Sequence, residues 1–281
     1  MNVNHFNISI VGLGVIGGSF AYHLNKLNFN NIWGIDKNLD TLQKAEADNM
    51  IEKGFDNPQY PIAHSDIVIL CIYPGNIVNF IQEYMYHFKS GAIIMDASGI
   101  KSKIMDQINI ERDDIDFVGG HPMAGNEGIG ITSASKTLFN NANFIITPTE
   151  NNKAESISLL TEILKEMGFG KISQVTPQMH DEMIGYTSQL PHIIAASIIN
   201  CHDNEDILRF TGNSFGEFTR IAKMNAPLWT DLIIGNKDNI LHLIDAFIGE
   251  MDQVRTAIAQ DNKSMLEEIF SNCTRKKEEM K

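Results

Sequence analysis

The sequence predicts an α/β fold, a doubly wound and mostly parallel sheet followed by a second, all-helical domain. Short β-branched or apolar runs alternate with helical patterns in the first part of the chain, and a glycine-rich turn separates the first strand from the first helix. After Val175 only helical patterns follow. Because such alternation is typical of parallel sheets with right-handed crossovers, we expect a sheet domain over residues 1–175 and a helical domain over residues 176–281.

Strands and helices are expected in turn along the first domain. The third strand is apolar throughout, which indicates a strand covered on both faces. The last two strands follow a Gly/Ser/Asn-rich stretch and should extend the sheet at its far edge. The expected strands are residues 7–12, 31–36, 66–73, 92–96, 116–120, 143–147 and 171–175. The expected helices are residues 16–27, 39–49, 74–88, 101–110 and 152–167.

The second domain begins at Thr176 and Pro177, a good N-cap followed by a residue suited to the first helical position. About five helical segments follow, and the long ones are expected at residues 178–200, 237–260 and 262–279. The second of these carries an apolar stripe broad enough to need a partner surface. The stripe consists of Leu241, Ile244, Phe247 and Ile248, with Met251 and Val254 beyond. Neighbouring helices of the same chain or a second copy would supply it, and we expect a homodimer.

Composition limits the classes of partner. With 281 residues the chain can form two ordinary domains, and none of its apolar runs reaches the roughly 18 residues of a membrane span. The net charge of −13 is unfavourable for binding nucleic acid. We therefore expect neither a membrane nor a nucleic acid as partner. An anionic ligand would need local positive groups, such as a helix N-terminus or one of the five arginines.

The three cysteines, Cys71, Cys201 and Cys273, are odd in number and form no CxxC spacing. Neither a disulfide framework nor a metal site is therefore expected. The apolar stretch from Ile8 lacks the basic segment of a secretion signal. These features predict a cytoplasmic protein.

A GxGxxG motif at residues 12–17 follows the first strand and opens the first helix, and Asp36 lies 19 residues beyond it, at the end of the second strand. The glycines permit a tight turn, close approach of a pyrophosphate and close packing of the helix, whose N-terminus faces the phosphates. This context predicts a Rossmann-type domain that binds a dinucleotide. The expected cofactor-binding residues are Gly12, Gly14, Val15, Ile16, Gly17 and Asp36, with Tyr73 and Pro74 after the third strand.

Asp36 favours NAD over NADP as the cofactor. Its carboxylate can accept hydrogen bonds from both ribose hydroxyls and would repel a 2′-phosphate. Lys37 beside it weakens this preference.

His121 is the candidate catalytic residue. It follows the strand expected at residues 116–120, at the strand ends where the nicotinamide would lie. An imidazole there is placed to take up the proton of a hydroxyl whose carbon gives up hydride. A purely structural histidine is the alternative.

Several motifs together resemble the prephenate dehydrogenase family, which includes arogenate dehydrogenases. They are GGHPMAGNEGIG at residues 119–130, SQLPH at 188–192, FTRIA at 218–222 and PLW at 227–229, together with the GxGxxG turn. The resemblance covers nearly the whole chain. It implies NAD-dependent oxidative decarboxylation of prephenate to 4-hydroxyphenylpyruvate, a step of tyrosine biosynthesis.

The resemblance also implies roles for residues of the second domain. Arg220 matches the arginine that binds a substrate carboxylate, for which a guanidinium fork is well suited. Ser188 and His192 match residues that line the substrate pocket, and their spacing places them on one helix face. Pro191 between them predicts a local kink. From the residues alone, a surface arginine and a core histidine remain the alternatives.

One motif departs from the family pattern. The family usually has Asp-x-Gly-Ser-x-Lys after its fifth strand, with the serine in contact with the catalytic histidine and the substrate hydroxyl. This chain has DASGIK at residues 96–101, so the serine and the glycine are exchanged. We expect Ser98 to be a catalytic residue if the loop brings it to His121.

Three other functions remain open. Arogenate dehydrogenase differs only in the amino group on the substrate side chain. A β-hydroxyacid dehydrogenase normally has a catalytic lysine on the first long helix of the second domain, and this chain has none between Met179 and Cys201. A non-catalytic NAD-sensing module would leave His121 and Arg220 without a role. Feedback by tyrosine, if present, is expected at the active site itself.

Overall fold

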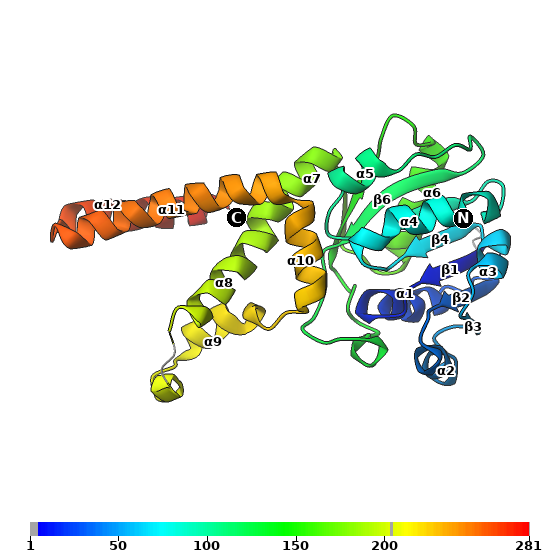
Figure 1. Cartoon of the computed structure of the whole chain (residues 1–281), viewed down its shortest axis with the longest axis horizontal. Coiled ribbons are helices and arrows are strands. Elements are labelled where there is room, and N and C mark those ends of the chain that lie inside the picture. The colour runs from blue at the N-terminus through cyan, green and yellow to red at the C-terminus, as the bar shows by residue number, and fades with distance from the viewer. Residues whose placement is uncertain (1–4, 203–204, 281) are drawn as a thin grey trace. The chain divides into compact units, whose positions relative to one another are not determined.

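The computed structural model describes residues 5–202 and 205–280 (Figure 1). The chain divides into two compact units, Met1–Asn236 and Lys237–Lys281. The first unit holds the sheet and the helices up to α10. The second consists of α11 and α12.

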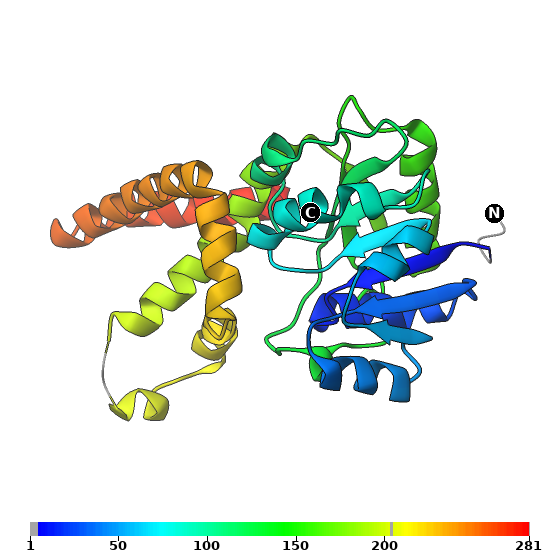
Figure 2. The same cartoon turned by 45° about the vertical axis from the view of Figure 1, so that its right-hand side comes forward.

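The sheet has eight strands in the order β3-β2-β1-β4-β5-β6-β7-β8. Neighbouring strands are parallel except β6 and β7, which are antiparallel. The order of the first six strands is that of a doubly wound dinucleotide-binding sheet, which confirms the predicted fold class. Figure 2 shows the blue and cyan strands side by side. The strands are β1 Asn7–Val11, β2 Asn31–Ile35, β3 Lys53–Phe55, β4 Ile67–Leu70, β5 Ile93–Asp96, β6 Asp116–Pro122, β7 Asn143–Thr147 and β8 Lys171–Gln174.

Helices cover both faces of the sheet. This agrees with the apolar strand predicted at residues 66–73, which corresponds to β4 and was expected to be covered on both faces. Successive side chains of β4 point to opposite faces: Ile67 and Ile69 join one hydrophobic cluster, and Val68 and Leu70 join the other. The first cluster includes apolar residues of α1 and α6, and the second includes those of α4. The helices of this part are α1 Val15–Asn25, α2 Leu39–Ala47, α3 Gln59–His64, α4 Pro74–Tyr84, α5 Ser102–Gln107 and α6 Ala154–Glu166.

The structure corrects the prediction at two places in the sheet. The strand β3 and the helix α3 were not expected, because three residues with a central glycine give no strand pattern and six residues give little helical periodicity. The strand β6 continues through His121 and Pro122, where His121 pairs with Ile145 of β7. His121 is therefore held by the sheet and does not lie on a loop.

The predicted helix at residues 178–200 consists of three parts. They are α7 Pro177–Ile184, a π-helical turn η3 at Gly185–Gln189, and α8 Leu190–Asn200. The irregularity thus lies on the N-terminal side of Pro191, within the turn that contains Ser188. The helices α9 Asn213–Thr219 and α10 Ala226–Gly235 complete this unit.

The second unit pairs α11 Lys237–Ala259 with α12 Lys263–Glu279. Asn262 caps α12, since its side chain accepts a hydrogen bond from the amide of Met265 at 3.1 Å. Three residues of the apolar stripe, Leu241, Ile248 and Met251, are about half exposed. No helix in the described ranges is both long and apolar enough to cross a bilayer. A division of the chain at Val175 stays a prediction.

Candidate active site

A cleft of about 710 Å³ lies at the carboxyl ends of the parallel strands. It is lined by the turn before α1, the start of α4, the loop after β5, and the end of β6 with the loop that follows it. Residues of η3, α8 and α10 and the segment between α9 and α10 also line it. Ten of the site residues predicted from the sequence line this cleft: Gly14, Val15, Ile16, Tyr73, Pro74, Ser98, His121, Ser188, His192 and Arg220.

The glycine turn before α1 fits the pyrophosphate of a dinucleotide. Gly12 has a φ of 88°, and a Cβ there would lie 2.7 Å from the carbonyl oxygen of Cys71. A Cβ on Gly17 would lie 1.9 Å from the carbonyl oxygen of Gly12, so α1 can approach the strand only with glycine at this position. Apart from the adjoining backbone, no heavy atom lies within 4 Å of a Cβ position on Gly14, which leaves the backbone open toward the cleft.

Asp36 is held at the end of β2 by two backbone amides. Its Oδ2 accepts a hydrogen bond from Leu13 N at 2.9 Å, and its Oδ1 accepts one from Asn38 N at 2.9 Å. Each oxygen keeps a further lone pair for a ribose hydroxyl. Asp36, Gly12 and Gly17 shape the turn and lie outside the residues that line the cleft.

His121 enters the cleft from the end of β6. Its Nδ1 lies 2.9 Å from Nε2 of His180. Burial is the main cause that lowers the pKa of His121 well below its ordinary value of 6.5, and electrostatic effects of His180 and Lys101 lower it further. At neutral pH the imidazole is therefore uncharged and able to accept a proton.

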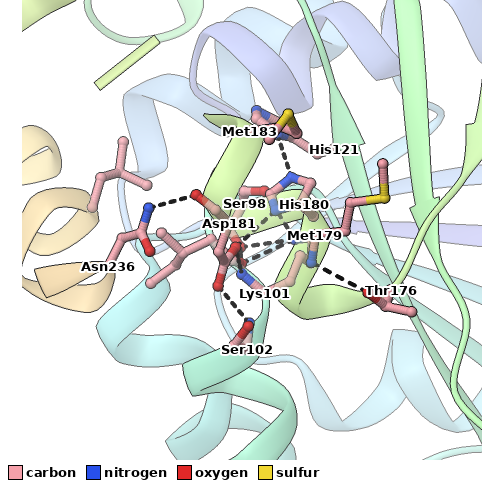
Figure 3. Close-up of polar contacts among 12 residues, drawn as sticks. Ser98, Lys101, Ser102, His121, Thr176, Met179, His180, Asp181, Met183 and Asn236 are labelled. Carbon is pink, nitrogen blue, oxygen red and sulfur yellow. Dashed lines mark hydrogen bonds and ion pairs between the residues drawn. The ribbon is translucent and has the colours of Figure 1, made fainter. Parts of the chain in front are cut away.

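His180 and Asp181 on α7 form a buried pair behind His121 (Figure 3). Nδ1 of His180 lies 2.7 Å from Oδ1 of Asp181. Neither residue was predicted to have a role. The available signal was a His-Asp pair on the predicted helix that also carries Ser188 and His192.

Ser98 lies at the cleft, but its hydroxyl is directed to a buried ion pair. It donates to Oδ2 of Asp96 at 2.6 Å, and Lys101 Nζ lies 2.5 Å from the same oxygen. The side chains of Asp96 and Lys101 have no exposed surface. Burial lowers the pKa of Lys101, and the carboxylate of Asp96 opposes this effect. The geometry gives Ser98 a contact with this pair rather than with His121.

His192 and Ser188 lie together on the helical side of the cleft. Nδ1 of His192 is 2.8 Å from the carbonyl oxygen of Ser188, and its ring stacks on Trp229 with 3.7 Å between ring centroids. Burial lowers the pKa of His192, so its imidazole is uncharged at neutral pH. A flat, neutral group of this kind can contact an uncharged part of a substrate.

Arg220 follows α9 and forms an ion pair with Glu127, from the loop after β6. Both residues line the cleft, and the Arg220 side chain is 64% exposed. Glu127 was not among the predicted site residues. An anionic ligand that binds Arg220 would have to take the place of this carboxylate.

Comparison with known proteins assigns the chain to a family. The model of the prephenate dehydrogenase nucleotide-binding domain matches residues 20–173, and the model of the prephenate dehydrogenase dimerization domain matches residues 176–272. The chain belongs to the prephenate dehydrogenase family. It is an NAD-dependent dehydrogenase, as the resemblance of its motifs implied.

Individual relatives of the chain are named prephenate or arogenate dehydrogenases. The prephenate dehydrogenase of Bacillus subtilis is 30% identical over 96% of this chain and 75% of its own length. A crystal structure of prephenate dehydrogenase from Aquifex aeolicus, in complex with hydroxyphenyl propionate and NAD+, has a TM-score of 0.89 at 27% identity and covers 98% of both chains. The Synechocystis arogenate dehydrogenase has a TM-score of 0.81 at 26% identity and covers 98% of this chain and 99% of its own.

The departure from the family's serine motif has a clear geometric result. Gly99 stands where the prephenate dehydrogenase pattern has its serine. A Cβ on Gly99 would lie 3.7 Å from both Cε1 and Nε2 of His121. A serine at position 99 would thus reach the ring of His121, whereas Ser98 has its hydroxyl bonded to Asp96.

Proposed function

We propose that this protein oxidises and decarboxylates prephenate with NAD, giving 4-hydroxyphenylpyruvate and CO2 for tyrosine biosynthesis. One observation carries the proposal: a single cleft contains the open backbone of Gly14, the uncharged imidazole of His121 and the guanidinium of Arg220. These groups match a dinucleotide, a hydroxyl proton and a carboxylate. NAD, when bound at the glycine turn, takes up the hydride from the hydroxyl-bearing ring carbon.

His121 would accept the hydroxyl proton of the substrate and later return it. Its Nε2 accepts the hydroxyl proton as the ring carbon becomes a carbonyl. The electron pair of the bond to the leaving CO2 then passes through the ring to this oxygen, and His121 returns the proton to give the phenol. The ring becomes aromatic, and no proton is gained or lost overall.

Arg220 would anchor a carboxylate of the substrate. Prephenate is a dianion and the chain has a net charge of −13, so a specific cation has to offset the repulsion. Arg220 would exchange Glu127 for the ligand, while Ser188 and His192 would line the pocket beside it.

Arogenate is the second candidate substrate, supported by the likeness to the Synechocystis arogenate dehydrogenase. The two substrates differ in a keto or an amino group on the side chain. An uncharged His192 offers no charge that would favour or repel the amino group.

The proposal extends to the assembly and the compartment. We propose a homodimer through the helical region, supported by the match to a dimerization domain and by the exposed stripe on α11. Three unpaired cysteines support a cytoplasmic enzyme.

An assay of NADH formation on prephenate, arogenate and a 3-hydroxy acid tests the function. We expect turnover of prephenate or arogenate, with the 3-hydroxy acid inactive. Turnover of the 3-hydroxy acid alone would indicate a β-hydroxyacid dehydrogenase. NAD binding without turnover of any substrate would indicate a sensing module.

A further inference from the structure

We infer that His180 is a positioning residue: held by Asp181, it fixes His121 in the tautomer that carries its proton on Nδ1 and leaves Nε2 free toward the cleft. This inference rests on the proposed function of His121 as the proton acceptor. It assigns a role to His180 and Asp181, two buried polar residues on α7 that take no direct part in the proposed reaction.

The contacts form a continuous chain from the cleft to the backbone (Figure 3). His121 Nδ1 is 2.9 Å from His180 Nε2, and His180 Nδ1 is 2.7 Å from Asp181 Oδ1. The carboxylate of Asp181 also accepts hydrogen bonds from the amides of Lys101 and Ser102, each at 2.8 Å. His180 and Asp181 are 1% and 2% exposed, so water does not compete for these bonds.

The position of each proton in this series of hydrogen bonds follows from the charge of Asp181. Burial alone would raise the pKa of Asp181, but hydrogen bonds from His180 and from the Ser102 amide keep it below its ordinary value. The ionised carboxylate can only accept, so Nδ1 of His180 carries a proton. In neutral His180 the other nitrogen, Nε2, is then an acceptor. His121 must donate to it from Nδ1, which leaves its own Nε2 unprotonated.

The neutral state of His180 is essential to this arrangement. If His180 were doubly protonated, its Nε2 would donate to His121 and force the proton of His121 onto the nitrogen that must act as the base. Burial lowers the pKa of His180, and the positive charge of Lys101 lowers it further, against the raising effects of Asp181 and Asp96. The charged or titratable groups that act on His180 within the described part of the chain are thus Asp181, Lys101, Asp96 and His121.

The exchange of Ser98 and Gly99 explains why this chain depends on His180. Gly99 has no side chain to offer the ring of His121, and the hydroxyl of Ser98 is bonded to Asp96. Within the described part of the chain, His180 is the one hydrogen-bond partner of the His121 ring. The orientation of the catalytic imidazole is therefore set from the Nδ1 side.

The test uses two variants and a matched control. His180→Leu removes the acceptor for His121 Nδ1, and His180→Gln retains an amide oxygen that can accept the same bond. His23→Leu is the control, since His23 is also a buried histidine with one ring hydrogen bond, to Met167 O at 2.9 Å, and it does not line the cleft. Thermal unfolding of all three, with kcat and KM for prephenate, separates loss of stability from loss of catalysis.

We expect His180→Leu to lower kcat at least about 10²-fold while KM stays within about twofold, because proton uptake matters in the transition state. His180→Gln should recover part of kcat, and His23→Leu should keep it. The inference would be overturned if His180→Leu retained wild-type kcat, or if it lost no more kcat than His23→Leu.

A second measurement does not depend on activity. Nitrogen-15 NMR of the histidine rings in the wild-type protein, with the His121 signals identified by their loss in His121→Asn, reports which ring nitrogen carries the proton. We expect the proton on Nδ1 of His121 at neutral pH. A proton on Nε2 would overturn the inference even if prephenate is turned over. A proton on Nδ1 without any turnover would support the positioning and count against the proposed function.

Discussion

His121 can act as a base only while its imidazole is uncharged. Burial, with Lys101 and His180 as further electrostatic causes, lowers its pKa well below 6.5, so the neutral form persists in mildly acidic solution. The rate should therefore stay level as the pH falls through 6.5, and it should decline only when the pH reaches the lowered pKa. Initial rates at saturating prephenate and NAD, measured at constant ionic strength, would show this limb. A decline centred at or above pH 6.5 would contradict the environment described for His121.

Arg220 is exposed and paired with Glu127, so its contribution to binding lies near the lower end of the range for charge-assisted pairs. We expect Arg220→Gln to weaken prephenate binding about 30-fold, or roughly 2 kcal/mol, with NAD affinity unchanged. Glu127→Gln should instead tighten prephenate binding a few-fold, because it removes the competing carboxylate. Titration of each variant with both ligands measures this. Unaltered prephenate affinity in Arg220→Gln would show that another cation is the anchor.

Asp36 should give the enzyme a strong preference for NAD. The amides of Leu13 and Asn38 fix its carboxylate where a ribose would bind, and a 2′-phosphate there would meet a negative charge. We expect kcat/KM to be at least about 10²-fold higher with NAD than with NADP, and Asp36→Asn to reduce this ratio. Equal efficiencies in the wild-type enzyme would remove this role from Asp36.

Among the elements, the glycine turn before α1 contains one glycine that α1 needs for packing, Gly17, and one that we expect NAD binding to need, Gly14. Gly17→Ala would place a methyl group 1.9 Å from the carbonyl oxygen of Gly12, so α1 must move and the midpoint of thermal unfolding should fall. Gly14→Ala has room within the protein, so the same midpoint should be retained while NAD binding weakens. Thermal unfolding and NAD titration of the two variants test this contrast. Unchanged NAD affinity in Gly14→Ala would show that the cofactor does not approach this backbone.

The pattern of elements was predictable wherever a segment was long enough to show its periodicity. The parallel strands, the glycine turn and the long helices follow from local sequence. The strand β3 and helix α3 were not predicted, since three and six residues carry too little pattern. The end of β6 was placed too early because its last residues, His121 and Pro122, are paired through β7, a contact distant in sequence.

The candidate site was predictable where a residue stands in a motif, as His121 and Arg220 do. It was not predictable where a side chain depends on tertiary partners. The hydroxyl of Ser98 turns to Asp96 because Lys101 is buried there, and His180 acquires its role only because α7 packs behind His121. Likewise, Glu127 becomes relevant only as the partner of Arg220.

For the whole molecule, the exposed stripe on α11 is the feature that a second copy should cover. Leu241, Ile248 and Met251 are 50%, 51% and 52% exposed in the single chain. We expect sedimentation at micromolar concentration to give about twice the chain mass of 31.4 kDa. Ile248→Asp should shift the protein toward the monomer, since a charge would be buried in the interface. A wild-type protein that sediments as a monomer would contradict the proposed dimer.

The central claim, that this cleft oxidises prephenate with His121 as the proton acceptor, is tested most directly by kcat for NADH formation from prephenate in the wild-type enzyme and in His121→Asn. Asparagine keeps a polar group at the end of β6 but cannot take up the proton. We predict a kcat at least about 10²-fold lower in the variant, with the KM for prephenate close to that of the wild type. A variant that retains the full kcat would contradict the account.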